Sequence, residues 1–130
     1  MQPAVRRKLP YDLERDLAPV GRIVLGPWVV VVNPSVPVKN AQQLIALARA
    51  NPNKLNYASS GIGSSAHITT ELFASMAGIR LTHVPYRGVG IAITSLLSGE
   101  TQLTFAPLVA VQPHLHSGRL RALAVSNPVR

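Results

Sequence analysis

Cysteine is absent from this 130-residue sequence, which excludes disulfide bonds, thiolate zinc sites and cysteine nucleophiles. Charged residues are scarce, at 14% against 47% hydrophobic residues, and this balance excludes an intrinsically disordered chain. The longest uncharged apolar run, residues 23–32, is interrupted by Gly26 and Pro27 and falls short of the ~20 residues of a membrane-spanning helix. We expect no signal peptide in this chain, since no apolar core follows its basic start. Length and composition predict one folded domain.

Acidic residues are the rarer charged type: five stand against thirteen Lys and Arg, which gives a formal net charge of +8. Most of the excess lies after residue 22, where eight basic residues face two acidic ones. A basic domain attracts anionic partners by long-range electrostatics. Residues 6–8 form the only basic run, and the phosphate-binding stripes and stacking aromatics of nucleic-acid-binding proteins are missing. We therefore expect no nucleic-acid partner, and keep a basic nucleic-acid-binding domain as an alternative.

Two regions are expected along the chain. Residues 1–22 contain three prolines and charges of both signs without apolar periodicity, and are predicted to form a connector arm. Residues 23–130 are predicted to form an α/β lobe that starts with Trp28–Val32, a β-branched run typical of a strand buried on both faces. Four further strands then alternate with helices. The expected strands cover residues 55–58, 81–84, 101–105 and 120–125, and the expected helices lie at 41–50, between Ala66 and Gly78, around 92–97 and at 108–116.

This alternation predicts an α/β fold with a mostly parallel sheet of about five strands and flanking helices. In such sheets, ligands bind beyond the carboxyl ends of the strands. The loops after Ala58, Val84 and Phe105 are therefore where a site is expected.

The glycine- and serine-rich segment at residues 59–65 lies between a predicted strand and a predicted helix. Its glycines permit a sharp turn close to a ligand, and the helix start offers unpaired N–H donors with a partial positive charge. We expect an anion site here, formed by the N–H groups of residues 61–65 and the hydroxyls of Ser60, Ser64 and Ser65, with His67 bracing the loop or donating to the ligand. In the structural alternative, Ser64 or Ser65 only caps the helix and the glycines shape a turn. The candidate ligand-binding residues are Ser59, Ser60, Gly61, Gly63, Ser64, Ser65 and His67.

The segment at residues 85–88 repeats this strand–loop–helix arrangement with a phenol and a guanidinium. Arg87 is placed to clamp a carboxylate with two hydrogen bonds. In the alternative interpretation, Tyr86 packs on the loop and Arg87 lies in solvent. Tyr86 and Arg87 complete the set of candidate ligand-binding residues.

The spacing Gly61-x-Gly63-x-x-Ala66 also matches the dinucleotide-binding fingerprint. That fingerprint needs an acidic residue ~20 positions later for the ribose, and residues 80–98 contain none. NAD is therefore disfavoured. An NADP-binding enzyme fragment stays open, with Arg80 or Arg87 meeting the 2′-phosphate.

Signatures of catalysis and metal binding are missing as well. The sequence has no G-x-S-x-G elbow and no Gly-Lys-Ser/Thr loop, and its few acids are poorly placed to orient a catalytic base. His114 and His116 would diverge on a helix instead of sharing a metal ion, and His83 is interpreted as a satisfied, partly buried histidine. We expect no catalytic residue, metal or cofactor, and a protein that is not an enzyme.

Six segments of the chain together resemble the Bug-type extracytoplasmic solute receptors of the tripartite tricarboxylate transporter family. They occur in the family's order with compatible spacing, from about residue 8 to the end. The segments are Leu9–Asp12, Asp16–Val20, Val32–Val38, Leu55–Ser65 with His67, His83–Gly88 and Ser117–Val125.

The resemblance implies a periplasmic receptor with a type II periplasmic-binding-protein fold, in which two α/β lobes close on a small carboxylate. This chain would supply a truncated second lobe, with the loop at 59–65 and His67 as that lobe's pincer and residues 1–22 as the tail of the first lobe. Membrane transporter subunits would be partners of the full-length receptor. Ala106 stands where some members have an acid, so recognition of a ligand amino group is not expected.

A single lobe would also leave apolar surface uncovered. We therefore expect self-association, with residues 1–22 or the strand at 23–32 packing against a second copy. We further expect weak or no carboxylate binding by the chain alone.

Overall fold

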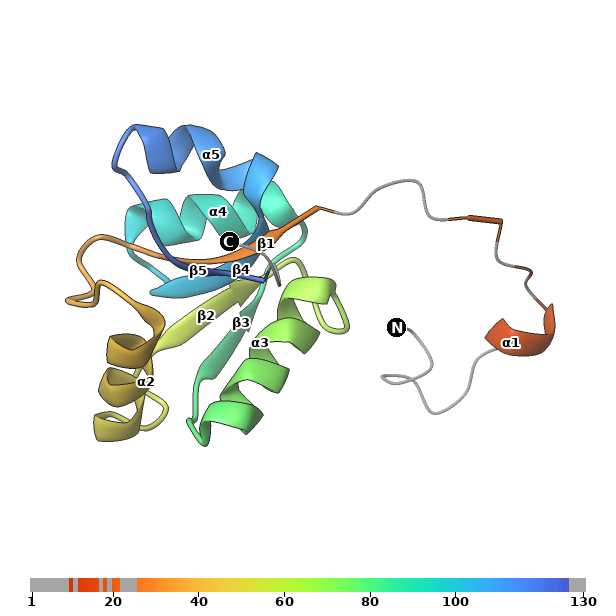
Figure 1. Ribbon diagram of the computed structural model, residues 1–130, viewed down its shortest axis with the longest axis horizontal. Coiled ribbons are helices and arrows are strands. Elements are labelled where there is room, and N and C mark those ends of the chain that lie inside the picture. Colours follow the sequence, from red (N-terminus) through yellow and green to blue (C-terminus); the bar gives the residue numbers. More distant parts are fainter. Residues whose placement is uncertain (1–9, 11, 17, 19, 22–25, 127–130) are drawn as a thin grey trace.

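A five-stranded sheet with the strand order β3-β2-β4-β1-β5 forms the centre of this computed structural model (Figure 1). The structure describes residues 10, 12–16, 18, 20, 21 and 26–126. Strands and helices alternate through the lobe, as the sequence predicts, although β2, β3 and β4 begin and end one or two residues later than expected. In chain order the elements are α1 (Leu13–Asp16), β1 (Trp28–Val32), α2 (Ala41–Ala50), β2 (Asn56–Ser59), α3 (Ser65–Ala77), β3 (Thr82–Pro85), α4 (Val89–Ser98), β4 (Leu103–Pro107), α5 (Leu108–His116) and β5 (Arg121–Val125).

The sheet is mixed, which corrects the prediction of a mostly parallel sheet in one respect. β2 pairs in parallel with both β3 and β4, whereas β1 pairs antiparallel with both β4 and β5. Four strands thus share one direction, and only β1 is reversed. The sequence pattern could not reveal this, because a strand buried on both faces has the same apolar run in either direction.

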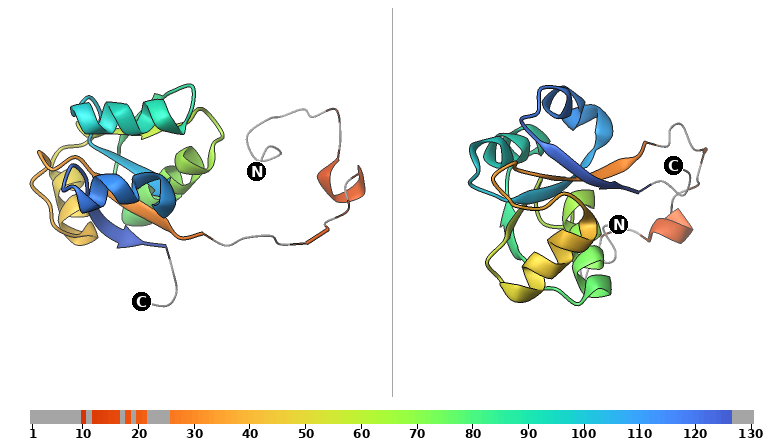
Figure 2. Two further views of the ribbon diagram at one scale, coloured as in Figure 1. Left: turned by 90° about the horizontal axis from the view of Figure 1, so that it is seen from above. Right: turned by 60° about the vertical axis from the view of Figure 1, so that its left-hand side comes forward.

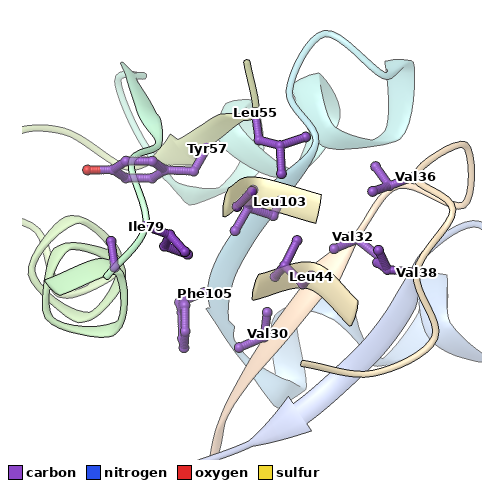
Figure 3. Packing of buried hydrophobic residues seen from close by; sticks show 12 residues of the cluster. Val30, Val32, Val36, Val38, Leu44, Leu55, Tyr57, Ile79, Leu103 and Phe105 are labelled. Atoms are coloured by element: carbon purple, nitrogen blue, oxygen red, sulfur yellow. The ribbon is translucent and has the colours of Figure 1, made fainter. Parts of the chain in front are cut away.

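The valines of β1 divide between two cores on opposite faces of the sheet, since successive side chains of a strand point to opposite sides. Val30 and Val32 pack with Leu44 of α2 in the first core (Figure 3). Val29 and Val31 join the second core, which α4 and α5 cover. The helices therefore form a layer on each face, with α2 and α3 on one and α4 and α5 on the other (Figures 1 and 2). This burial confirms the sequence prediction for β1.

Predicted end signals of α2 and α3 are found where expected. Asn40 caps α2 by accepting a 2.9 Å hydrogen bond from Gln43 N–H, and the Gln43 amide oxygen accepts one of 2.8 Å from Lys39 N–H. Gly78 ends α3 in the left-handed conformation at φ 62°, which glycine adopts without a Cβ penalty. Both local signals confirm the helix boundaries that position the loops.

Several connections meet at the edge of the sheet where β2, β3 and β4 end. Ser59 lies opposite Pro85, which brings the loops after β2 and β3 side by side. Trp28 lies opposite Pro107, and Ser126 N–H donates to the Trp28 carbonyl at 2.7 Å, so β1 begins and β5 ends at this same edge. The predicted site loops are therefore neighbours in space.

The predicted arm at residues 1–22 falls mostly outside the described residues, so its boundary stays a prediction. Its described part includes one helical turn, α1, with an ion pair of 2.8 Å between Arg15 and Asp16 on the surface. Within the part of the chain that the structure describes, no helix has the length and hydropathy to cross a membrane.

Candidate functional site

A tight turn connects β2 to α3 at the carboxyl edge of the sheet. Gly61 and Gly63 have φ values of 125° and 78°, where a side chain would be strained. Ser64 N–H donates to the Gly61 carbonyl at 3.2 Å and closes the turn. The glycines are needed for the path of the backbone, as the structural interpretation of the sequence expected.

Ser59 holds this turn from inside the protein. Its side chain is fully buried, and its hydroxyl oxygen accepts a 3.1 Å hydrogen bond from Gly61 N–H and lies 2.6 Å from Nε2 of His83. This candidate residue therefore supports the loop and does not face a ligand.

Ser64 and His67 fix the other side of the turn. The Ser64 hydroxyl accepts a hydrogen bond of 3.3 Å from His67 N–H and caps α3. In return, Nδ1 of His67 accepts a hydrogen bond of 3.1 Å from Gly63 N–H. His67 braces the loop in this way, which is one of the two roles that the sequence suggested.

Fewer backbone donors are free than the sequence predicts. The N–H groups of Gly61, Gly63 and Ser64 all donate within the loop. In the described structure no acceptor contacts the N–H group of Ile62 in the loop, nor the N–H groups of Ser65 and Ala66, which begin α3. The first turn of α3 carries no acidic residue, so its positive dipole end is not neutralised locally.

Ala66, one of these three residues, lines a shallow cleft. Its volume of about 20 Å³ holds about one water molecule, so it forms a floor and not an enclosed pocket. Ser60 and Thr104 supply its only polar side chains, and none of its lining residues is charged. The lining comes from the loop and α3, the start of α4, the end of β4 and the start of β1: Trp28, Ser60, Ala66, Val89, Ala92, Ile93, Thr104, Phe105, Ala106 and Pro107.

The loop at residues 85–88 is tied to the first loop by its backbone. Tyr86 N–H donates to the Ser59 carbonyl at 2.9 Å. The Tyr86 hydroxyl is buried without a hydrogen-bond partner in the described structure, and burial raises the pKa of this phenol, with Glu100 adding to the effect and Ser95 opposing it. Arg87 is exposed. Both parts of the structural alternative for this loop are therefore found.

A stack of three aromatic rings lies against the glycine loop. The His83 ring is 4.7 Å from the Tyr57 ring and 4.2 Å from the His67 ring, and each pair is within 15° of parallel. The Tyr57 hydroxyl donates to Oε1 of Glu71 at 2.5 Å. Burial and then the Glu71 carboxylate raise the pKa of Tyr57 far above its usual value. Burial lowers the pKa of His83, His67 lowers it further, and Glu71 opposes both.

Sequence reasoning did not assign Tyr57 or Glu71 to the site, and it treated His83 as a satisfied, partly buried residue. His83 is partly buried and bonded, so that interpretation is confirmed. One spacing could have pointed to part of the stack, because His67 and Glu71 are four apart on one helix. The pairing of Tyr57 with His83 is a matter of the register of β2 and β3, which the structure supplies. The described residues include no cluster of three or more side chains that could hold a metal ion.

Comparison with known proteins extends these observations. Residues 1–130 match the family described as the tripartite tricarboxylate transporter family receptor. Protein BugT of Bordetella pertussis is 38% identical over 117 residues, which are 90% of this chain and 36% of BugT. A protein of R. palustris solved with adipate is 39% identical with a TM-score of 0.87, and a structure described as a periplasmic transporter is 36% identical with a TM-score of 0.89.

The chain spans about a third of its curated relatives and about two fifths of those two solved chains: 36% of BugT, 42% of the R. palustris protein and 43% of the periplasmic transporter. The two structural alignments include 97% and 98% of this chain. The five-stranded sheet with its helices thus corresponds to one lobe of the solved proteins. With its full length matched by the family, the chain belongs to the receptors of the tripartite tricarboxylate transporter family.

Proposed function

We propose that this chain is the ligand-binding lobe of a periplasmic receptor that captures a small carboxylate and delivers it to the membrane subunits of a tripartite tricarboxylate-type transporter. The observation that carries this proposal is the free N-terminus of α3. Ser60 and Ala66 line the cleft, and the Ser60 hydroxyl and the N–H groups of Ala66 and its neighbour Ser65 have no partners among the described residues. Such a group of donors suits a carboxylate. The role is binding and transport, without catalysis.

The cleft also favours one kind of acid. Next to the donors of the glycine loop, the walls are almost entirely apolar, from Val89 and Ile93 on one side to Phe105 and Pro107 on the other. A chain of methylene groups gains from such a surface, whereas a hydroxyl or an amino group would lose its hydration there without a partner. Ala106 supplies no acid for an amino group. We expect an unsubstituted dicarboxylate to bind better than a hydroxy acid or an amino acid, in line with the adipate in the 39% identical R. palustris structure.

Tight binding requires a second lobe that covers the ligand. The floor is shallow, and binding proteins of this kind enclose the ligand between two lobes. The chain alone should therefore bind carboxylates only in the millimolar range, which corresponds to about 4 kcal/mol. NMR spectroscopy of the ¹⁵N-labelled chain detects binding of this strength.

Titration with adipate tests the proposal. We expect the amide signals of Ser65 and Ala66 to shift with a single dissociation constant, while those of α2 stay in place. Hexane-1,6-diol, which has the same carbon chain without charges, is the matched control and should not shift them. Ser64→Ala, which removes the cap of α3, should weaken adipate binding roughly tenfold, as expected for a lost hydrogen bond that supports a charged group. Absence of any adipate-dependent shift would contradict the proposal.

The two alternatives have their own outcomes in the same series. An NADP-binding enzyme fragment would show NADP-dependent shifts around Gly61 and Arg87 at micromolar concentration. A nucleic-acid-binding domain would be retained on heparin until high salt releases it. Either result in place of carboxylate binding would replace the present proposal.

Self-association is a further part of the proposal. Residues 1–22, or the strand that the sequence places at 23–32, would pack against a second copy. Residues 22–25 lie outside the described residues, but Trp28 at the start of β1 lines the cleft. Light scattering at micromolar concentration should give a mass above 14 kDa, and a monomeric mass would contradict this part.

A further inference from the structure

The aromatic stack behind the glycine loop imposes a protonation state on it. Gly63 N–H points at Nδ1 of His67, with 3.1 Å between the two nitrogens. An imidazole nitrogen accepts a hydrogen bond only when it carries no proton. His67 must therefore be neutral with its proton on Nε2. In an imidazolium, the N–H group at Nδ1 would face the Gly63 N–H group, and neither could accept a hydrogen bond.

His83 transmits this arrangement to the other end of the turn. Its Nε2 contacts the Ser59 hydroxyl at 2.6 Å, and the same hydroxyl oxygen accepts from Gly61 N–H. Its ring lies 4.2 Å from the His67 ring and 13° from parallel. One imidazole thus holds Gly63, the other holds Gly61 through Ser59, and the two rings support each other.

The groups around His67 and His83 differ in whether they favour or disfavour a positive charge on these rings. Each imidazole disfavours an imidazolium on the other, because two positive rings at this separation repel. Glu71 of α3 attracts a positive charge, although its carboxylate already accepts from Tyr57 of β2. Tyr57 is neutral, and α4 carries no titratable residue. Burial lowers the pKa of His83 and so adds to the preference for a neutral His83 ring.

We propose that His67 and His83 are positioning residues that keep the glycine loop in its binding conformation only while His67 is neutral, so that acidification loosens the loop and weakens ligand binding. The statement about the loop stands without the proposed function, whereas the statement about the ligand rests on it. The mechanism is local: protonation of Nδ1 removes the acceptor of Gly63 N–H and adds repulsion within the stack. The donors of Ser65 and Ala66, which follow directly, then lose their fixed direction.

The first experiment needs no ligand. Long-range ¹H–¹⁵N spectra of the histidine rings in the full chain at pH 8 should show His67 with an unprotonated Nδ1 and a protonated Nε2. On acidification from pH 8, the Gly63 amide signal should move together with the His67 ring signals. A proton on Nδ1 at pH 8, or a Gly63 amide that does not follow the ring, would overturn the proposal.

The second experiment compares His67→Asn with the parent chain. The Asn side-chain oxygen lies at about the place of Nδ1 and accepts from Gly63 N–H, but it does not titrate. Adipate binding by the parent should weaken about two- to tenfold once the His67 ring signals show the charged form, the loss expected for one hydrogen bond. Binding by His67→Asn should change only as far as adipate itself takes up protons. Equal pH dependence in both chains, or tighter binding by the parent in that charged form, would overturn the proposal.

A third experiment uses two variants of His83 to separate its hydrogen bond to Ser59 from its ring stacking. His83→Gln keeps a polar group at the place of Nε2 beside Ser59, whereas His83→Phe keeps the stacked ring without it. The Gln variant should retain the Gly61 amide position and the Phe variant should lose it. If no chain binds adipate at any pH while the ring spectra are as described, the carboxylate function fails and the positioning role remains.

Discussion

The two loops at the carboxyl edge of the sheet have the same topology but differ in how many side-chain hydrogen bonds hold them. Each follows a strand of the parallel part of the sheet, and each leads into a helix preceded by a glycine or serine cap. The loop at residues 59–65 is held by Ser59, Ser64 and His67 through hydrogen bonds. The loop at 85–88 begins α4 at Gly88 without any side-chain cap and leaves the Tyr86 hydroxyl unpaired. The first loop is therefore organised before a ligand arrives, whereas the second retains unused donors.

The largest difference should appear when a hydroxyl is removed from the first loop. Ser59→Ala leaves Gly61 N–H and His83 Nε2 without their partner in a buried place, and each such group costs about 1–3 kcal/mol. Urea unfolding should show that loss of stability. Ser60→Ala is the matched control, because the Ser60 hydroxyl has no partner among the described residues; it should leave stability unchanged and weaken adipate binding. Equal stability of the two variants would contradict the role of Ser59.

Glycine replacement should affect the two loops alike. Gly61 and Gly88 have φ values of 125° and 132°, so Gly61→Ala and Gly88→Ala should each cost about 1–3 kcal/mol as backbone strain. Gly90, in the first turn of α4, has no such φ, and no atom lies within 4 Å of the place that an alanine Cβ would take there. Gly90→Ala should therefore be neutral or slightly stabilising, by up to about 1 kcal/mol. Thermal unfolding of the three variants gives the comparison, and a stable Gly61→Ala would show that the turn adapts.

Acid should destabilise the first loop through its histidine pair. Because the pKa of His83 lies below its ordinary value of 6.5, the folded protein favours the neutral ring. The resulting contribution to stability is fully present above pH 6.5 and is lost as the pH falls through the lowered pKa. His83→Phe should show a flatter dependence of stability on pH between 7.5 and 5. Unfolding curves across this range test the sign, and a parent chain that gains stability on acidification would refute it.

The smallest effect is expected at the second loop. Tyr86→Phe removes a buried hydroxyl that makes no hydrogen bond in the described structure, so it should be neutral or stabilising by less than about 1 kcal/mol. Its contrast with Ser59→Ala, which also deletes one hydroxyl, is the sharpest test of the difference between the loops. A loss of stability as large as that of Ser59→Ala would show that Tyr86 has a partner after all.

Much of the fold follows from local signals in the sequence. The apolar periodicity and the cap at Asn40 predict α2 at the observed residues 41–50, and α5 is likewise found at 108–116. The location of the glycine loop between a strand and a helix was predicted as well. These features depend on neighbours within a few positions, where side-chain chemistry and backbone preference act directly.

Local signals did not decide which loop donors are free. We expected the N–H groups of residues 61–65 to hold a carboxylate, but Gly63 N–H is bound to His67 and Gly61 N–H to Ser59. Both bonds join residues only two and four positions apart, but the side chains that accept them are themselves held by His83, which the register of β2 and β3 puts beside Ser59 and stacks on His67. A pairing between strands some 25 positions apart is not encoded in either strand alone.

The sequence by itself determined the alternation of strands and helices, the glycine turn and the basic, cysteine-free character of the chain, because composition and short-range periodicity fix them. The tertiary structure decided the reversed direction of β1, the meeting of the site loops at one edge and the stacking of His83 on His67. Each of these depends on which buried surfaces and hydrogen-bonding groups meet across the sheet. Burial of the Val29–Val32 run is equally favourable in either strand direction, so only the packing of the whole lobe selects one.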